Sequence, residues 1–382
     1  MRDPPSRIIE RMSSWFETWM PPHRLAVAVV VTALVVLSTA TVVLRSTHEQ
    51  EREDRVSAHL ARGHQLVAEQ QLAAGVDEFR AALALERDHV EAGRALALTL
   101  LSLGRIEESD SHLRELLREN PTDGPLNRGL ARIHALRGRD GAARTAYQRA
   151  IYGEWPGDGI AEKNRTRFEF IDYLTRIGAR DEVLPELLRL RAELPSGRTA
   201  AARRAANLLV EYGAGDLAIE TLRTTALTAP RDVELLAHLA ELQANAGLVQ
   251  DARSTLRTAV AIEPGRSDLA ERLHIVNRIM VLDPTLPRLG LVTRTRRARL
   301  LLGQVIEGTK DCDGEPQVKA LRTVARQRLR VRARADAEAA EEDLALAARI
   351  WAAAPACHAS SLDARAIGQV LQRITAAAEP AT

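Results

Sequence analysis

The histidines, cysteines and carboxylates of this 382-residue sequence form no pattern typical of a catalytic site. His59 and His64 are five residues apart, so on one helix they would not share a face that could bind a metal. Residues 311–314, Asp-Cys-Asp-Gly, begin like a calcium loop, but the later ligands are missing. The sequence also lacks a glycine-rich phosphate loop and the HExxH, GxSxG and CxxCH motifs. We therefore predict that the protein is not an enzyme and uses neither a metal nor a cofactor.

The two cysteines could form one covalent bond. Cys312 and Cys357 are separated by 44 residues. In an oxidising compartment, a disulfide closing that loop would stabilise the fold by roughly 3–4 kcal/mol. The alternative is a pair of buried thiols. Cys357 and the adjacent His358 do not form a metal site, because zinc needs three or four ligands.

The charge of the chain argues against a dedicated nucleic-acid binder. Lys and Arg number 53 and Asp and Glu number 51, for a net charge of +2, whereas nucleic-acid binders usually carry a basic excess. Only three of the basic residues are lysines, which we attribute to a GC-rich bacterial genome. Arginines are dense at 294–299 and 322–334 and could meet phosphates or anionic lipid. Because acidic residues follow at 338–343, a solvated helix face is the simpler interpretation.

A long apolar segment, Leu25 to Leu44, predicts one membrane span. It has 20 residues without a charge or a proline. At ~1.5 Å per residue it extends ~30 Å, the thickness of the bilayer hydrocarbon core. A cleaved signal peptide would have a shorter apolar region, and Ser38 and Ala40 could precede its cleavage point. Because apolar residues continue through Leu44, we favour an uncleaved anchor in a bacterial inner membrane.

The residues on either side of the span are polar or amphipathic. The tail, 1–24, has apolar residues at helical spacing between 8 and 19, which fits a short amphipathic helix in the membrane interface. A disordered tail is the alternative. Residues 45–55 form a polar linker. Arginines flank both ends of the span, so the positive-inside rule discriminates little. A short tail before a single span usually stays inside, which would place the large C-terminal part outside the cytoplasm.

Residues 56–264 contain internal repeats with a period of 34 residues. Small residues and large apolar residues recur at this spacing: Gly63, Ala97, Ala131, and Phe79, Leu113, Tyr147. Glycines recur at the turn of each expected helical pair and prolines near its end: Gly104, Gly138, Gly178, Gly213, Gly247, then Pro121, Pro195, Pro230, Pro264. Glycine supplies the positive φ that ends the first helix, and proline ends the second. Because one pair cannot bury its apolar face alone, the pairs must stack.

This pattern resembles the tetratricopeptide repeat (TPR) family. The family places a small residue in the first helix, a glycine in the turn, then alanine, a large apolar residue, alanine and a terminal proline. The sixth repeat has them all: Ala240, Gly247, Ala252, Leu256, Ala259, Pro264. The fourth is weaker, and the first lacks the turn glycine and the proline. The resemblance implies an all-α fold, in which six pairs over 56–264 form an α-solenoid.

Residues 265–382 are expected to be a helical C-terminal cap. Ser267 to Leu282 begins a seventh pair, and further helices are expected around 293–309, 316–353 and 362–377. Such helices would cover the last apolar face of the array.

The resemblance also implies a binding surface, because stacked pairs of this family line a concave groove with their first helices. The positions that would face the groove are mostly basic: Arg94, Arg128, Arg132, Arg165, Asp172, Arg176, Arg203 and Asn207. Arginines bind carboxylates through charge-assisted hydrogen bonds, so the expected partner is an acidic or C-terminal peptide. Arg203 and Asn207, one turn apart, have the spacing with which some members hold a terminal carboxylate. The alternative is that an arginine-rich genome places arginine at random.

Two functions remain open. The first is a membrane-anchored scaffold that recruits a partner protein or peptide through the groove. The second is a structural subunit that stabilises a membrane complex through its convex face and cap, without peptide recognition. The sequence identifies neither the partner nor the oligomeric state.

Overall fold

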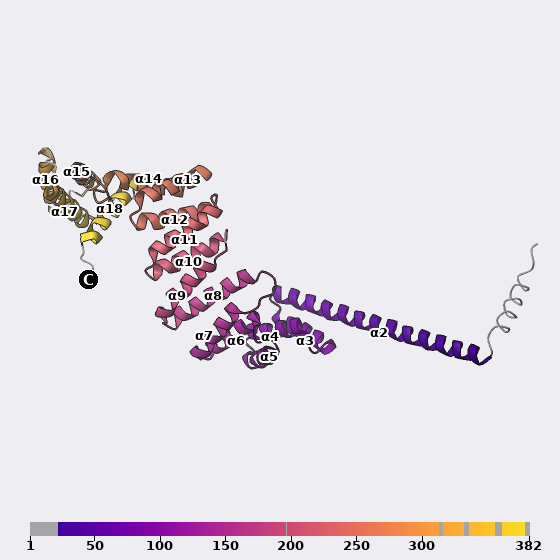
Figure 1. Cartoon of the computed structure of the whole chain (residues 1–382). Helices are drawn as coiled ribbons and strands as arrows, with labels where there is room; N and C mark the ends of the chain where they lie inside the picture. The colour runs from indigo at the N-terminus through magenta and orange to yellow at the C-terminus, as the bar shows by residue number, and fades with distance from the viewer. Residues whose placement is uncertain (1–21, 196, 313–315, 332–335, 356–360, 379–382) are drawn as a thin grey trace, which may run out of the picture. The chain divides into compact units, whose positions relative to one another are not determined.

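The computed structural model describes residues 22–195, 197–312, 316–331, 336–355 and 361–378, and these are helical apart from turns and one isolated bridge (Figure 1). The helix expected at residues 8–19 lies outside this part. The described helices are α2 (Pro22–Ala68), α3 (Leu72–Leu85), α4 (Val90–Ser102), α5 (Ile106–Glu119), α6 (Gly124–Leu136), α7 (Asp140–Tyr152), α8 (Gly159–Arg176), α9 (Arg180–Glu193), α10 (Thr199–Glu211), α11 (Gly215–Thr228), α12 (Val233–Asn245), α13 (Val249–Ile262), α14 (Ser267–Leu282), α15 (Leu291–Gly308), α16 (Pro316–Arg330), α17 (Ala337–Ala353) and α18 (Leu362–Ala378).

Internal contacts divide the chain into two units, unit 1 (Met1–Tyr173) and unit 2 (Leu174–Thr382). The boundary lies inside α8. The sequence period predicts one array over 56–264 and gives no sign of this division.

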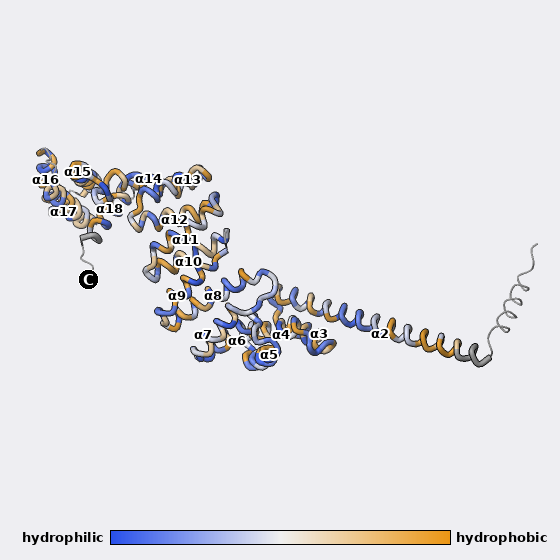
Figure 2. Tube along the Cα trace, in the orientation of Figure 1, coloured by the Kyte–Doolittle hydropathy of each residue, from blue (hydrophilic) through white to orange (hydrophobic). Residues whose placement is uncertain are grey.

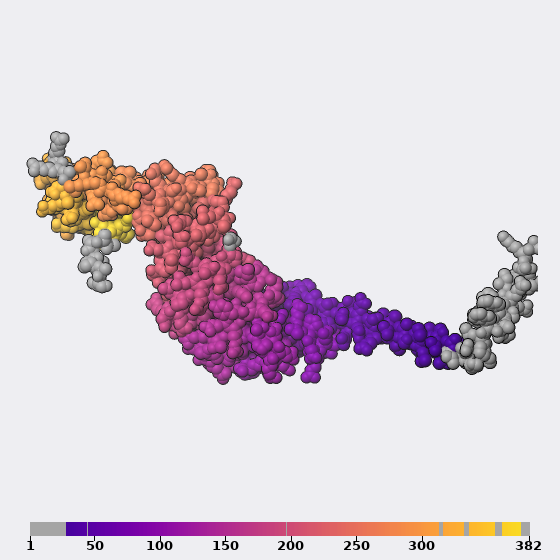
Figure 3. Space-filling model, viewed as in Figure 1, coloured from indigo at the N-terminus to yellow at the C-terminus, as the bar shows by residue number. Residues whose placement is uncertain are grey.

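α2 joins the apolar segment to the first helical pair without a break. Within the described part, it is the one helix long and apolar enough to cross a membrane, a property that a signal sequence shares. Its residues 28–43 are all exposed, and Figure 2 shows hydrophobic residues toward its start and a hydrophilic stretch after them. In Figure 3 this part of α2 has no other described element beside it. The expected linker, 45–55, is helical, and burial begins at Val56.

The two helices of a pair approach closely because small residues lie between them. A Cβ on Gly63 of α2 would lie 2.5 Å from the ring of Phe79 on α3, so only glycine fits there. Ala97 and Ala131, one and two periods later, are fully buried. The predicted small position is thus the contact point of the pairs.

The turns and ends of the pairs follow the predicted signals. The predicted turn glycines have φ between 64° and 80°: Gly104, Gly138, Gly178, Gly213 and Gly247. In the first pair, which has no turn glycine, Gln70 adopts φ 64°. The prolines at 121, 195, 230 and 264 each lie two residues beyond the end of a second helix. The 34-residue period therefore predicts these boundaries correctly.

The six extra residues between the third and fourth pairs fold back on the third pair. The Glu154 backbone N–H donates to the Thr122 carbonyl at 2.7 Å, and the Gly124 N–H donates to the Glu154 carbonyl at 2.8 Å. The Trp155 indole N–H donates to the Ala150 carbonyl at 2.7 Å and covers Gly124 so closely that a Cβ there would lie 2.2 Å from it. The insertion is therefore an ordered part of unit 1.

The C-terminal cap shares a core with the last repeats. Leu302, Val305, Ile350 and Val370 belong to one buried cluster with Leu256 of α13. Four helices, α15 to α18, make up the described part of the cap, as the sequence predicts in outline.

The segment 316–353 is two helices, where the sequence pattern indicates one. α16 ends at Arg330, and the Arg299 guanidinium satisfies the carbonyls of Arg328 and Leu329 at 2.9 and 2.8 Å. α17 begins after Asp336, whose carboxylate caps it by accepting from the Glu338 N–H at 3.3 Å. Polar caps at both ends thus stabilise a break that apolar periodicity does not reveal.

Truncation of the conserved-spacing residue Leu113 is predicted to destabilise unit 1. Leu113 is fully buried, so Leu113→Ala should lower the free energy of unfolding by about 2–5 kcal/mol, through lost apolar burial and a cavity. Leu136→Ala is the matched control, because that side chain is 70% exposed and its loss should change the free energy by no more than about 0.5 kcal/mol. Urea unfolding followed by circular dichroism measures both. Equal effects of the two variants would contradict the packing described here.

Candidate functional site

Arg94, on α4, is bound to the helix that begins the next pair. Its Nε donates to Asp123 Oδ2 at 3.0 Å, and its Nη2 donates to the same oxygen. The other oxygen of Asp123 accepts from the Leu126 backbone N–H at 2.9 Å and caps the N-terminus of α6. Asp123 is buried and the Arg94 side chain is 22% exposed. Arg94 therefore connects two pairs.

Arg128 and Arg132, one turn apart on α6, hold the same carboxylate of α8. Arg132 binds Glu169 with two hydrogen bonds of 2.6 and 2.7 Å, and the Arg128 Nε donates to it at 2.8 Å. The Tyr147 hydroxyl donates to Glu169 at 3.1 Å. This arrangement is a complete carboxylate-binding site, and a side chain of the next pair occupies it.

The charge of Glu169 is stabilised by these partners. Burial alone would raise the pKa of Glu169, but the hydrogen bonds from Arg132 and Arg128 and their positive charges more than offset it, so the pKa lies below its ordinary value. The hydrogen bond to Glu169 correspondingly raises the pKa of Arg132. Glu169 therefore stays ionised well into the acidic range.

Arg165 is the most exposed predicted site residue with a described partner in unit 1. It lies on α8 and forms an ion pair with Glu162, three residues before it, and its side chain is 64% exposed. Glu162 also accepts from Arg128 at 3.3 Å. Such a local surface pair is weak, so Arg165 can exchange its partner at little cost.

In unit 2 the predicted site residues have little or no internal pairing. The Arg203 guanidinium lies 3.8 Å from Glu234, which also accepts from Arg266 at 2.8 Å. Arg176 and Asn207 are exposed and, in the described part of the chain, make no hydrogen bond or ion pair. Asp172, at the end of unit 1, is exposed as well. These positions are the ones free to meet a partner.

The residues that sequence reasoning missed are the carboxylates opposite the arginines. Asp123, Glu169 and Glu234 each lie between 29 and 41 residues downstream of the arginine they bind. That separation is about one period, so a search for opposite charges one repeat ahead would have found them. The predicted arginines therefore do not form a continuous free basic surface.

The described residues contain no group of three or more metal-ligating side chains. Cys312 is buried against Val318 and Ala354. Cys357 lies outside the described residues, so its pairing with Cys312 stays a prediction.

Comparison with known proteins identifies no relative by sequence: no family model matches, and no curated protein is similar. Among solved structures, PilF of Pseudomonas aeruginosa is 14% identical with a TM-score of 0.39, over 58% of this chain and 97% of that chain. YrrB, described as a TPR protein with an unusual peptide-binding site, is 17% identical with a TM-score of 0.34, over 50% and 95%. The P58(IPK) TPR domain is 14% identical with a TM-score of 0.29, over 85% and 99%.

At such low identities and TM-scores, these likenesses say nothing of partner or activity. The class of fold follows from the chain itself, from its 34-residue period, its paired helices and its turn glycines. It is an all-α, TPR-like α-solenoid with a helical C-terminal cap.

Removal of the charge of Glu169 is predicted to destabilise unit 1 in a pH-dependent way. Glu169→Gln should lower the free energy of unfolding by roughly 1–3 kcal/mol at pH 7, because two arginines lose their shared anion. Because the folded-state pKa is depressed, this contribution is present above the ordinary value of 4.5 and is lost as the pH falls through the folded-state pKa.

Urea unfolding of wild type and variant at pH 7 and at pH 3 tests this, and the difference should shrink at pH 3. Glu115→Gln is the control, since Glu115 is exposed and makes no described ion pair. A difference that stays constant with pH would show that the charge of Glu169 is not what stabilises the contact.

Proposed function

We propose that the protein is a membrane-anchored scaffold for protein–protein interaction, without catalytic activity of its own. The observation that carries this proposal is the continuity of α2. The helix that contains the apolar segment also packs on α3 as the first helix of the first pair. An anchor and a repeat array that share one helix act as a single device.

The polar part of α2 is suited to act as a spacer. Residues 45–55 are exposed, and ion pairs one turn apart support the helix: Arg45 with Glu49 at 2.8 Å, and Glu51 with Arg55 at 3.8 Å. Twelve residues separate Leu44 from Val56, so at 1.5 Å per residue the first packed residue would stand ~18 Å beyond the span. We propose that the anchor lies in a bacterial inner membrane and that the C-terminal part is extracytoplasmic.

The proposed recruiting surface is the exposed subset of the first-helix arginines. Arg165, Arg176 and Arg203 can take a new carboxylate without breaking a buried contact. The two hydrogen bonds from Arg132 to Glu169 support an acidic or C-terminal peptide as the ligand, since they demonstrate how this face binds a carboxylate. Asn207, one turn after Arg203, would add a neutral donor.

One observation favours the second function, a structural subunit. Arg94, Arg128 and Arg132 are already held by carboxylates of the neighbouring pair. If these bonds are their whole purpose, the partner binds elsewhere, on the second helices and the cap.

The anchor makes a prediction about location. The full chain expressed in bacteria should stay in the membrane pellet after carbonate extraction, and protease added to spheroplasts should digest residues beyond the span. In that oxidising compartment, Cys312 and Cys357 should be bonded, so the intact mass should lack two hydrogens relative to the reduced chain. A soluble chain whose N-terminus begins after Ala40 would instead identify a cleaved signal sequence.

Charge reversal distinguishes the two functions. Arg165→Glu/Arg176→Glu/Arg203→Glu should reduce in-cell crosslinking to the main partner by about tenfold or more, because each lost charge-assisted hydrogen bond contributes roughly 1.5–3 kcal/mol. The matched control is Arg118→Glu/Arg149→Glu/Arg257→Glu, which changes the net charge equally at exposed positions of second helices. Loss in the control alone would support the structural subunit and reject recruitment through the arginines.

A further inference from the structure

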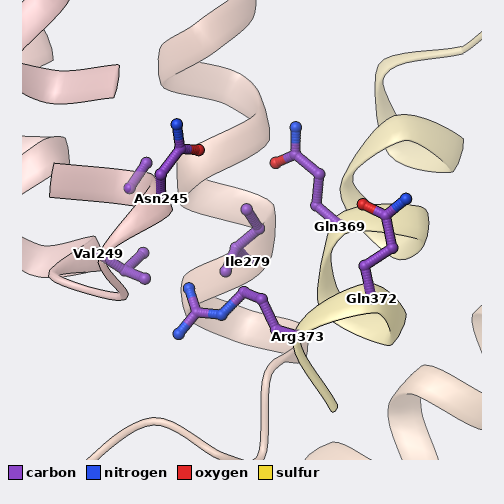
Figure 4. Close-up of a pocket in the computed structure, with 7 residues that line it drawn as sticks. Asn245, Val249, Ile279, Gln369, Gln372 and Arg373 are labelled. Atoms are coloured by element: carbon purple, nitrogen blue, oxygen red, sulfur yellow. The ribbon is translucent and has the colours of Figure 1, made fainter. Parts of the chain in front are cut away.

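A groove lies in unit 2 between the end of α12, the face of α14 and the last helix, α18 (Figure 4). It consists of two adjoining cavities of about 360 and 240 Å³, which share Ala244, Asn245 and Gln369. Because α18 belongs to the cap, this groove is not a product of the repeats alone.

The floor of the groove is apolar. Ile275, Val276 and Ile279 of α14 line it, together with Val249 and Leu256 of α13. All five are buried and belong to the core of unit 2, so the floor is fixed. It can accept apolar side chains but offers them no hydrogen bond.

Three carboxamide side chains border this floor. Figure 4 shows Asn245 on one side and Gln369 and Gln372 on the other. All three are exposed, and none makes a hydrogen bond to the described part of the protein. Each carboxamide has two donor hydrogens and an acceptor oxygen, the complement of a backbone N–H and C=O.

The charged residues beside the groove are balanced. Arg272 donates to Glu241 at 3.0 Å, and the Arg373 Nε lies 3.4 Å from the buried Asp283. The groove therefore presents no unpaired charge, in contrast to the arginines of the first helices.

The wall formed by α18 is held in place by its own ion pairs. Asp363 lies 2.8 Å from Arg278 and 3.0 Å from His274, and Arg365 lies 3.1 Å from Glu271. These contacts fix α18 along α14, so the distance between the carboxamides is set before any ligand binds. Preorganisation of this kind lowers the entropic cost of binding.

We propose that this groove, here called the cap groove, binds an extended, uncharged segment of a partner protein. An extended segment has unpaired backbone N–H and C=O groups for the three carboxamides, whereas a helical segment has already paired its own. Its alternate side chains would point to the apolar floor. The absence of unpaired charge excludes a strongly acidic ligand. The inference rests on the proposed scaffold function and gives it a second, chemically different site.

The test begins with a phage-displayed library of random 12-residue peptides. The library is selected on the full chain in detergent, with counter-selection on Asn245→Ala/Gln369→Ala/Gln372→Ala, here called the carboxamide variant. Selected peptides should lack charged residues. As synthetic fluorescent peptides, they should bind the carboxamide variant at least about tenfold more weakly, by anisotropy. N-methylation of alternate backbone amides in the peptide should weaken binding by a similar factor.

The matched control is Gln148→Ala/Gln317→Ala/Gln327→Ala, which removes three exposed carboxamides elsewhere and should bind within twofold of wild type. Because every substituted side chain is exposed, both variants should fold, which circular dichroism verifies. Peptides that bind wild type and the carboxamide variant equally would overturn the inference, as would a selection that enriches none.

The outcome is separable from that of the scaffold proposal. Enrichment of acidic peptides that are lost in Arg165→Glu/Arg176→Glu/Arg203→Glu would reject the cap groove and support recruitment through the arginines. Peptide binding at the cap groove by a chain found outside the membrane would reject the anchored scaffold and retain the groove.

Discussion

A pair of helices cannot cover its own apolar face, and this constraint organises both units of the chain. Close approach inside a pair is the first requirement. Gly63 makes room for Phe79, and at the next period the Ser109 hydroxyl donates to the Ala97 carbonyl at 2.7 Å, so the two helices touch through a backbone contact. Stacking of pairs is the second requirement, and the cap is its consequence. The cluster that contains Leu256 continues into Leu302 and Val370, so the last repeats are buried by helices that follow no repeat pattern.

Stacking also determines what happens to the charges. When a pair is placed against the next, the polar side chains of its first helix come within reach of that neighbour, and opposite charges there form pairs. The free energy of each pair depends on its exposure. The bond between Arg94 and the buried Asp123 cannot be broken without leaving a buried anion, whereas exposed pairs such as Arg165 with Glu162 contribute about 0–1 kcal/mol. A basic position in the sequence is therefore a binding group only if the neighbouring pair leaves it exposed.

The sequence predicts the parts of the structure that repeat and misses the parts that do not. The period of 34 residues places the pairs, and the turn glycines and prolines place their ends, because local backbone requirements recur in every repeat. The partners of Arg128 and Arg132 were not predicted, because an insertion of six residues shifts Glu169 out of the period. The break between α16 and α17 depends on Arg299 and Asp336, two polar caps without apolar periodicity. The cap groove depends on α18, which lies more than a hundred residues along the chain from α12 and shares no motif with it.

The spacer in α2 gives geometric meaning to these surfaces. A polar helix of this length is unstable by itself, because nucleation is costly and its surface packs on nothing. In this chain it needs no nucleation, since it continues the apolar segment at one end and packs into the first pair from Val56 onward at the other. A flexible linker would let the array sample many heights, but a continuous helix sets one, through its fixed rise per residue. In the proposed function, a partner is then selected by the height at which it presents its binding segment as well as by the chemistry of that segment.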